Sequence, residues 1–273
     1  MRRLPAPAKI NLALVAGPRR SDGKHEVATV LQRVDLADRV QLEGSPDGPH
    51  VTGFAGDTLV RRALELIAAE AGVEPRWRVT LTKRIPVAAG LGGGSSDAAA
   101  ALRLANETLA EPLPPDALHA VAARLGADVP FFLQPGPRLG TGNGTELAPL
   151  GLPQDFFVLL VLPVGAAKPS TESVYAAFDE RGGEDGFADR RAELLAALER
   201  VGRPRDLAAL PKNDLASSPL VRVLEQLGAF RADVSGAGPT VYGLFHHRPL
   251  AEAARRRLRG RGRLWLTVPA WYG

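Results

Sequence analysis

The chain has 273 residues, of which 45% are hydrophobic and 23% are charged, and its formal net charge is +4. This balance is ordinary for a globular protein, and the length accommodates two domains or one large α+β unit. The absence of cysteine excludes disulfides and thiolate-bound metals. No stretch approaches the roughly 18–20 apolar residues that span a bilayer, so we expect a cytoplasmic protein with no membrane partner.

The positive charge raises the question of nucleic-acid binding. The densest basic run, 255–263, interrupts its arginines with leucine and glycine and contains no aromatic residue. Such a run is more typical of a solvated helix face and turn than of a nucleic-acid site. We therefore predict no nucleic-acid partner, although a mild positive field suits an enzyme whose substrates carry phosphates.

Strand and helix patterns follow one another along the first half of the chain. Alternating or continuous apolar runs predict strands, and apolar residues spaced three and four apart predict helices. The expected strands are 8–15, 27–34, 39–42 (after a turn at 35–38), 76–85 and 129–133, and the expected helices are 59–71, 98–109 and 116–125.

The second half opens on a nearly continuous apolar strand at 156–163. The acidic, glycine-rich segment 180–189 predicts a loop. Further helices are expected at 173–178, 190–200 and 220–227, and further strands at 231–235, 240–245 and 264–268. This mixture of helices with antiparallel-looking strands favours an α+β fold over a doubly wound sheet.

A glycine-rich segment, Gly90 to Ser96, lies between an expected strand and an expected helix. Glycines let backbone N–H groups approach a phosphate, and the helix N-terminus adds its positive dipole end. A Walker A loop would need lysine followed by serine or threonine, and a dinucleotide fingerprint would need glycine at the position of Ser95. The segment therefore predicts a different kind of triphosphate loop, and the alternative is a glycine turn feeding a closely packed helix.

Three other features join this loop as candidates. A second glycine cluster, Ser235 to Thr240, is either a hairpin turn or a second wall for the nucleotide phosphates. Asp128 stands between a helix and an apolar run, at the edge of a dry pocket or as a turn cap. Lys9, in the first strand, is the obvious cationic partner of that carboxylate. The five histidines show no spacing typical of metal ligands, so the ligands of any metal stay unknown.

Three motifs give the chain a family resemblance: Pro7 to Leu12, Pro86 to Ala99, and Ser235 to Gly243. With these motifs the chain resembles the galactokinase, homoserine kinase, mevalonate kinase and phosphomevalonate kinase superfamily, the GHMP kinases. The resemblance implies a two-domain α+β fold with its active site in the interdomain cleft. The implied domains are an ATP-binding N-terminal domain at 1–152, to which the C-terminal strand 264–273 is a candidate addition, and a C-terminal domain at 153–263.

The resemblance also implies an activity, in which the γ-phosphate of ATP passes, with Mg²⁺, to the 2-hydroxyl of a cytidylyl-methylerythritol substrate. The implied partner is thus a small molecule with a cytidine diphosphate group, and the enzyme is expected to be a monomer or weak homodimer. The residues implied as catalytic are Lys9 and Asp128. Those implied as ATP-binding are Lys83, Pro86, Gly90, Leu91, Gly92, Gly93, Gly94, Ser95, Ser96 and Asp97. Those implied as substrate-binding are Asn11, His25, Thr171 and Tyr175.

The chain departs from the family pattern at three positions. Lys24 replaces the usual tyrosine before His25, so one stacking ring of the implied cytosine site is absent. Thr58 and Asp97 replace residues that are often asparagine. Two alternatives remain: a kinase of the same superfamily with another acceptor, and a non-catalytic nucleotide or nucleic-acid binder. Retention of both Lys9 and Asp128 argues against the binder, since a binder needs no such pair.

Overall fold

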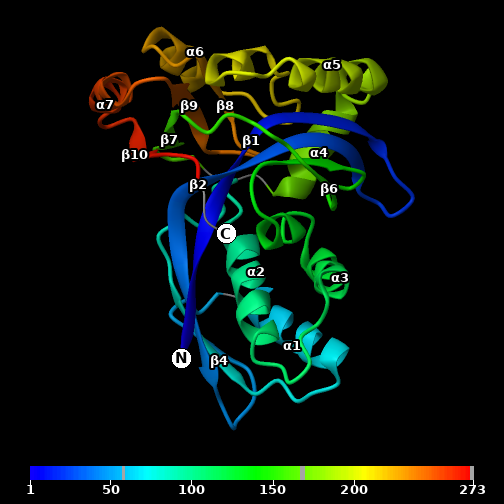
Figure 1. Cartoon of the computed structure of the whole chain (residues 1–273). Helices are drawn as coiled ribbons and strands as arrows, with labels where there is room; N and C mark the ends of the chain where they lie inside the picture. The colour runs from blue at the N-terminus through cyan, green and yellow to red at the C-terminus, as the bar shows by residue number, and fades with distance from the viewer. Residues whose placement is uncertain (57–58, 167–169, 271–273) are drawn as a thin grey trace.

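The computed structural model describes residues 1–56, 59–166 and 170–270 (Figure 1). Its elements in the first half are β1 (Arg2–Arg19), β2 (His25–Gly44), β3 (His50–Thr52), α1 (Leu59–Ala71), β4 (Trp77–Thr82), α2 (Gly93–Asn106), α3 (Pro115–Leu125), the 3₁₀ helix η1 (Pro130–Leu133), β5 (Arg138–Thr141) and β6 (Glu146–Pro149). Those in the second half are β7 (Phe157–Pro163), α4 (Thr171–Glu180), α5 (Phe187–Glu199), the 3₁₀ helix η2 (Pro204–Ala209), α6 (Pro219–Gln226), β8 (Arg231–Val234), β9 (Val241–Phe245), α7 (Arg248–Arg257) and β10 (Gly262–Thr267).

The described strands form two sheets. The first has six strands in the order β3-β4-β2-β5-β6, with β1 paired to β2. The second has four strands in the order β10-β7-β9-β8, all antiparallel to their neighbours. Figure 1 shows helices α1 to α3 in the half that holds β4, and α5 to α7 in the half that holds the second sheet.

The long hairpin β1–β2 runs through both halves (Figure 1). Near the chain start it contributes Ala6, Val40 and Leu42 to a core with α1, α2 and α3. Farther along, apolar residues of the same hairpin, such as Ile10 and Val30, belong to a second core with β7, β9 and α5. One continuous ribbon thus connects the two main apolar cores, because its side chains pack on different partners along its length.

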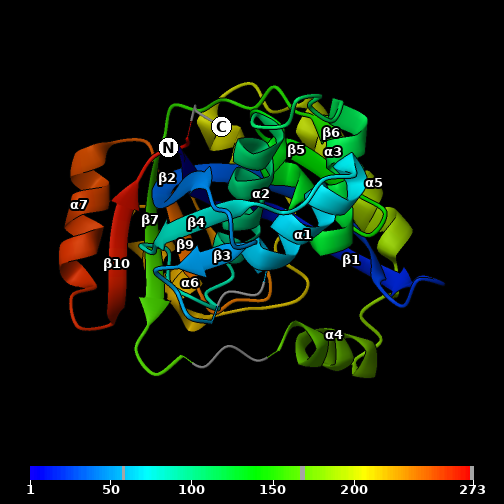
Figure 2. The same ribbon diagram turned by 90° about the horizontal axis from the view of Figure 1, so that it is seen from below.

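Helix α4 lies apart from helices α5 to α7 in the view from below (Figure 2). Its buried residues Val174 and Phe178 are four apart and therefore share one helix face. They pack in a small cluster with Leu14 of β1 and with Leu215. This contact fixes the position of α4 beside the middle of the hairpin.

The expected mixture of helices and sheets is confirmed, and α1 covers the expected range 59–71. The expected strand at 264–268 forms as β10, which pairs with β7 of the second sheet. Beyond it, Pro269 makes an isolated bridge with Val34 of β2. The domain limits at 152 and 263, and the assignment of 264–273 to the first domain, stay predictions.

Two expected local structures are wrong. Residues 27–34 and 39–42 are not separate strands, because β2 continues through the expected turn at 35–38. Residues 129–133 form no strand but the 3₁₀ helix η1, with Pro130 at its first position, where a missing N–H costs no bond. A short apolar run cannot be assigned to strand or helix from its pattern alone.

Candidate active site

Lys9 and Asn11 lie on a stretch of β1 between two shifts of its register with β2. The shifts fall between Pro7 and Ala8 and between Asn11 and Ala13. Residues two apart on a strand point to the same face, and register irregularities re-aim the side chains beside them. Both side chains are buried and both line the same pocket. The local sequence thus directs a lysine and an amide together into one cavity.

The ammonium of Lys9 is held between an amide and a carboxylate. Its Nζ donates to Asn11 Oδ1 at 2.7 Å and lies 3.4 Å from Asp128 Oδ2. Asn11 is fixed in turn, because its Nδ2 donates to Thr29 Oγ1 at 2.8 Å. The Lys9 side chain is only 5% exposed, whereas that of Asp128, on the connection between α3 and η1, is 39% exposed. The cation is therefore fixed and the carboxylate is accessible.

The first glycine loop leaves no room for a side chain at Gly90 and little room for one at Gly92. Gly90 and Gly92 have φ values of 78° and 70°, in the left-handed region that favours glycine. A Cβ at Gly90 would lie 2.4 Å from the carbonyl oxygen of Ser235, and one at Gly92 would lie 3.0 Å from the Lys9 side chain. Helix α2 begins at Gly93, five residues before its expected start. As at every helix N-terminus, its first N–H groups have no partner within the helix.

The second glycine cluster touches the first loop directly. Ser235 Oγ donates to the carbonyl oxygen of Gly90 at 2.9 Å, and the N–H of Thr240 donates to the carbonyl oxygen of Ala89 at 3.2 Å. Gly236 and Ala237 line the same pocket as the first loop. The second cluster is the hairpin turn between β8 and β9, and it also lies against the first loop, although Ser235 and Gly90 are 145 residues apart in the chain. Its part in holding nucleotide phosphates stays a prediction.

A half-buried lysine and two buried carboxylates lie beside the start of the loop. Lys83 Nζ pairs with Asp38 and Asp97, whose side chains are fully buried. Burial lowers the pKa of Lys83, but the charges and hydrogen bonds of Asp97 and Asp38 outweigh it and raise that pKa above its usual value. Asp38 Oδ1 also accepts the backbone N–H groups of Arg84 and Ile85. Asp38 thus fixes the chain where it enters the glycine loop.

His25 forms the other end of the pocket with residues of α4. Its ring stacks on Tyr175 with centroids 4.4 Å apart and an interplanar angle of 18°, and Phe178 meets it edge-on. Its Nε2 lies 2.7 Å from Asp179 Oδ1. An ionised carboxylate only accepts, so Nε2 carries the proton and Nδ1 is the ring's remaining polar atom. Burial, with a smaller effect from Asp128, raises the pKa of Tyr175 to about 12, so its phenol is neutral near pH 7.

These groups line one pocket of about 810 Å³. The expected site residues on its wall are Lys9, Asn11, His25, Lys83, Pro86, Gly90, Leu91, Gly92, Gly93, Gly94, Ser95, Asp128, Thr171 and Tyr175. Ser96 and Asp97 do not line it, since both are buried within α2, and Asp97 instead contacts Lys83. Lys24 lines the pocket as an exposed residue, and Thr58 lies outside the described residues.

The sequence did not point to four residues that contribute to the site: Asp38, Thr29, Phe54 and Asp179. No sequence pattern identifies Asp38, because a carboxylate buried in a strand cannot be distinguished by sequence from one in a turn. For Asp179 there was a pattern, since it follows Tyr175 by four residues and so lies on the same helix face. Phe54 lines the pocket, and its ring centroid is 5.9 Å from Lys83 Nζ.

Within residues 1–56, 59–166 and 170–270, no group of three or more histidine, aspartate or glutamate side chains could hold a metal ion. In the same residues no helix is both long and apolar enough to cross a membrane. Phosphate oxygens are ligands that Mg²⁺ commonly takes.

Comparison with known proteins gives two family matches. The model for the N-terminal domain of GHMP kinases matches residues 58–136, and the model for their C-terminal domain matches 188–264. A crystal structure of mevalonate kinase, 12% identical in sequence, superposes with a TM-score of 0.76 over 98% of this chain and 99% of that chain. At that identity the likeness shows the fold alone.

Nearer relatives share one name. The chain is 39% identical to 4-diphosphocytidyl-2-C-methyl-D-erythritol kinase of an Anaeromyxobacter species, over 93% of this chain and 85% of that protein. It is 36% identical to the kinase of the same name from Bacillus pumilus, covering 93% and 92%. A crystal structure of 4-(cytidine 5'-diphospho)-2C-methyl-D-erythritol kinase has 34% identity and a TM-score of 0.77, covering 98% and 99%. The chain therefore belongs to the 4-diphosphocytidyl-2-C-methyl-D-erythritol kinase family of the GHMP kinases.

Proposed function

We propose that this chain transfers the γ-phosphate of ATP to the 2-hydroxyl of 4-diphosphocytidyl-2-C-methyl-D-erythritol, a step of the non-mevalonate route to isoprenoid precursors. The observation that carries the proposal is the Lys9–Asp128 pair, which lies in one pocket with two glycine loops at one end and the His25–Tyr175 stack at the other. This arrangement supplies a phosphate cradle, a reacting centre and an aromatic end in that order.

ATP fits the first end. The first turn of α2 and the loop glycines offer backbone N–H groups to an anion, and the close approach at Gly90 excludes side chains from the cradle. Lys83 and the apolar ring of Phe54 would receive the adenine end. The other residues proposed for ATP binding are Pro86, Leu91, Gly92, Gly93, Gly94, Ser95, Ser96 and Asp97. Bound Mg²⁺, carried by the phosphates, would neutralise charge that develops during transfer.

Asp128 is the proposed base or orienting group for the acceptor hydroxyl. Its carboxylate is exposed to the pocket and can accept a hydroxyl proton, whereas its partner Lys9 is nearly buried. The Lys9 ammonium pairs with that carboxylate and offsets negative charge on the transferring phosphoryl group. Asn11 holds the ammonium with its amide oxygen, and its amide nitrogen, which also donates to Thr29, has a second N–H for the substrate.

The cytidine diphosphate group would occupy the end formed by His25 and α4. Asp179 fixes the His25 ring, which leaves Nδ1 for a polar edge of cytosine. One face of the Tyr175 ring covers His25, so the base would meet the opposite face or its edge. Thr171, at the start of α4, would contact the same substrate. Lys24 and Arg19, both exposed on the pocket wall, place positive charge near the diphosphate.

The decisive assay is ADP release with a panel of acceptors: the cytidylyl substrate, mevalonate, homoserine and galactose. Turnover with the cytidylyl compound alone is the expected result. Activity with another panel member alone would transfer the assignment to that relative. No turnover together with tight, salt-sensitive RNA binding would favour the non-catalytic binder.

The role of Asp128 has its own test. Asp128→Asn keeps the shape of the side chain but removes its basicity. We expect turnover to fall by at least about 10²-fold, the lower end for a general base. Because the side chain is well exposed, the variant should melt near the wild-type temperature, and near-normal turnover would contradict the assigned role.

We further propose a cytoplasmic enzyme that acts as a monomer or weak homodimer, with its active site in the cleft between domains at 1–152 and 153–263. The pocket wall supports the cleft, since it includes residues from both ranges, such as Asp128 and Tyr175. Size-exclusion chromatography with light scattering, across a range of protein concentrations, measures the oligomeric state directly.

A further inference from the structure

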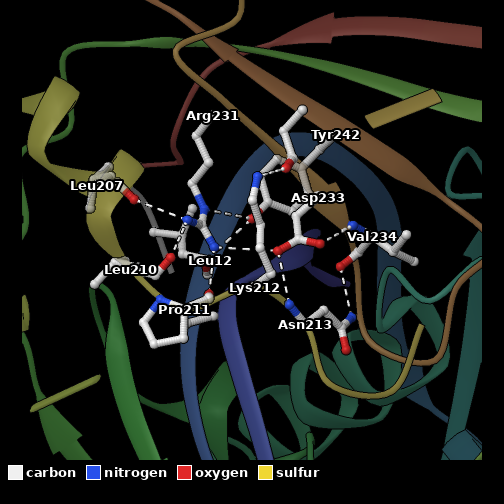
Figure 3. Close-up of polar contacts among 12 residues, drawn as sticks. Leu12, Leu207, Leu210, Pro211, Lys212, Asn213, Arg231, Asp233, Val234 and Tyr242 are labelled. Carbon is white, nitrogen blue, oxygen red and sulfur yellow. Dashed lines mark hydrogen bonds and ion pairs between the residues drawn. The ribbon is translucent and has the colours of Figure 1, made fainter. Parts of the chain in front are cut away.

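A buried polar network precedes the second glycine cluster in the chain, and Figure 3 shows its contacts around Arg231, Asp233 and Asn213. Its centre is Arg231 of β8, whose side chain is fully buried. The guanidinium donates to the carbonyl oxygens of Leu207, Leu210 and Pro211, at 3.2, 2.6 and 2.8 Å. A guanidinium has five donors in a rigid fork, so these bonds fix the segment after η2 against β8.

Asp233 connects Arg231 to the backbone N–H groups of Asn213 and Val234. Its Oδ2 lies 3.3 Å from Arg231 Nη2 and accepts the backbone N–H of Asn213 at 3.0 Å. Its Oδ1 accepts the N–H of Val234 at 2.8 Å. Burial raises the pKa of the Asp233 carboxyl, and Arg231 opposes that rise. The backbone position of Asn213 is thereby fixed relative to β8.

The Asn213 side chain makes three hydrogen bonds, all of them to backbone groups. Its Nδ2 donates to the carbonyl oxygens of Val234 at 2.9 Å and Gly236 at 2.7 Å. Its Oδ1 accepts the N–H of Leu215 at 2.8 Å. Gly236 and Leu215 line the pocket, whereas Asn213 is only 9% exposed and does not. The Gly236 carbonyl is therefore turned to the protein interior.

The orientation of that carbonyl determines the orientation of the next N–H. In a trans peptide the C=O and the following N–H point in opposite directions, so the N–H of Ala237 points away from Asn213. Among the described residues this N–H has no hydrogen-bond partner, and Ala237 lines the pocket. Gly236 lies against the reacting centre, since a Cβ on it would be 3.3 Å from Lys9 Nζ.

We propose that Asn213 is a positioning residue that holds the Gly236–Ala237 peptide with its N–H toward the pocket, where it donates to the phosphoryl group beside Lys9. This inference rests on the proposed function. If the peptide turned over, its carbonyl oxygen would face the phosphoryl oxygens, and a hydrogen-bond donor would be replaced by a negative dipole end. Asn213 acts through this peptide and touches no substrate itself.

The test compares Asn213→Ala with Lys212→Met as a matched control. Lys212 donates to Ala232 O and to Glu225, so it also ties this segment to the second sheet, but it contacts neither glycine loop. We measure kcat, KM for both substrates, the dissociation constant of ATP without acceptor, and the melting temperature. Each variant loses hydrogen bonds between this segment and the second sheet, but only Asn213→Ala removes the bond to the Gly236 carbonyl.

For Asn213→Ala we expect kcat to fall about 10- to 100-fold, below the ~10²–10³-fold cost of deleting a donor outright, because water replaces part of the bond. We expect the ATP dissociation constant to rise about 3- to 10-fold, and KM for the cytidylyl substrate to stay within about threefold, since the lost contact lies at the phosphate end. Lys212→Met should leave all three constants within about twofold. Equal kinetic losses in both variants, or none in Asn213→Ala, would overturn the inference.

A second variant addresses the same N–H without touching the anchor. Ala237→Pro removes the donor outright, because proline has no N–H, and should lower kcat by ~10²–10³-fold, at least as much as Asn213→Ala does. If Asn213 acts through this donor, adding Asn213→Ala to Ala237→Pro should change kcat by less than about threefold, whereas independent roles would multiply. If the wild type released no ADP with the cytidylyl compound, the proposed function would fail, and the ATP dissociation constants would still decide the role of Asn213.

Discussion

Replacing Asp38 tests whether the chain entering the glycine loop is held by one buried carboxylate. In the structure Asp38 is 1% exposed, pairs with Lys83 and accepts the N–H groups of Arg84 and Ile85. Asp38→Ala removes all three interactions. Asp38→Asn keeps an oxygen for the two N–H groups but turns an NH₂ toward the ammonium of Lys83.

The expected magnitude follows from these contacts. Each buried N–H left unsatisfied costs about 1–3 kcal/mol. Breaking a buried ion pair from one side costs about 3–5 kcal/mol, but Lys83 keeps Asp97 and some solvent, so this part is smaller here. We therefore expect Asp38→Ala to lose about 3–5 kcal/mol of unfolding free energy, and Asp38→Asn about half as much. For a chain of this length, 1 kcal/mol shifts the melting temperature by about 2–4 °C, so the alanine variant should melt roughly 10 °C lower.

Thermal unfolding followed by circular dichroism measures this shift, and the KM for ATP reports the loop. Glu43→Gln is the matched control on the same strand, because its pair with Arg78 is 3.6 Å long and nearly half exposed. Exposed pairs contribute about 0–1 kcal/mol, so the control should melt within about 4 °C of wild type. If Asp38→Ala melted as high as Glu43→Gln, the carboxylate would not hold the loop entrance as argued.

Three further predictions concern other residues that line the pocket, namely Gly90, Lys83 and Tyr175. Gly90→Ala should lower kcat/KM by about 10²-fold or more, because a misplacement near 1 Å has that cost and its Cβ would meet Ser235 O at 2.4 Å; Gly151→Ala, with open space around it, should match wild type. The pKa of Lys83 is raised in the folded state. The stability that its charge contributes is therefore fully present below about pH 10.4, the unfolded lysine value, and is lost as pH rises through the higher folded pKa. Between pH 7 and 11 the melting temperature should fall less steeply with pH for Asp38→Asn than for wild type. Tyr175→Phe should keep KM for the cytidylyl substrate, since the phenol, with its pKa of about 12, is neutral near pH 7. Tyr175→Ala should raise that KM up to about 10-fold through loss of an aromatic contact. Equal KM values for the two variants would contradict the stacking role.

Elements with strong local periodicity were predictable. The helix at 59–71 repeats apolar residues on one face and ends before Gly72, and both signals are local. The continuous strand β2 was not, because the polar residues that resemble a turn at 35–38 find partners far along the chain. The backbone N–H of Asp35, for example, donates to the carbonyl oxygen of Val268. Such partners have no signature in the local sequence.

The site divides in the same way. The family resemblance pointed to Lys9, Asp128 and both glycine clusters, and the structure brings all of them to one pocket. Their catalytic and binding roles stay predictions. The supporting residues could not be found this way. Asp38 and Asn213 act by fixing backbone groups of other segments, and their contacts depend on how distant strands pair rather than on a motif.

The hairpin β1–β2 belongs to both apolar cores, and this has a consequence for how activity appears during folding. Lys9 lies on the stretch of ribbon that faces residues of both halves, with Asp128 on one side and Gly236 on the other. If only one half of the chain has folded, Lys9 lacks either Asp128 or the second glycine cluster. Under the proposed function, a partly folded chain would therefore be inert toward ATP instead of hydrolysing it without an acceptor.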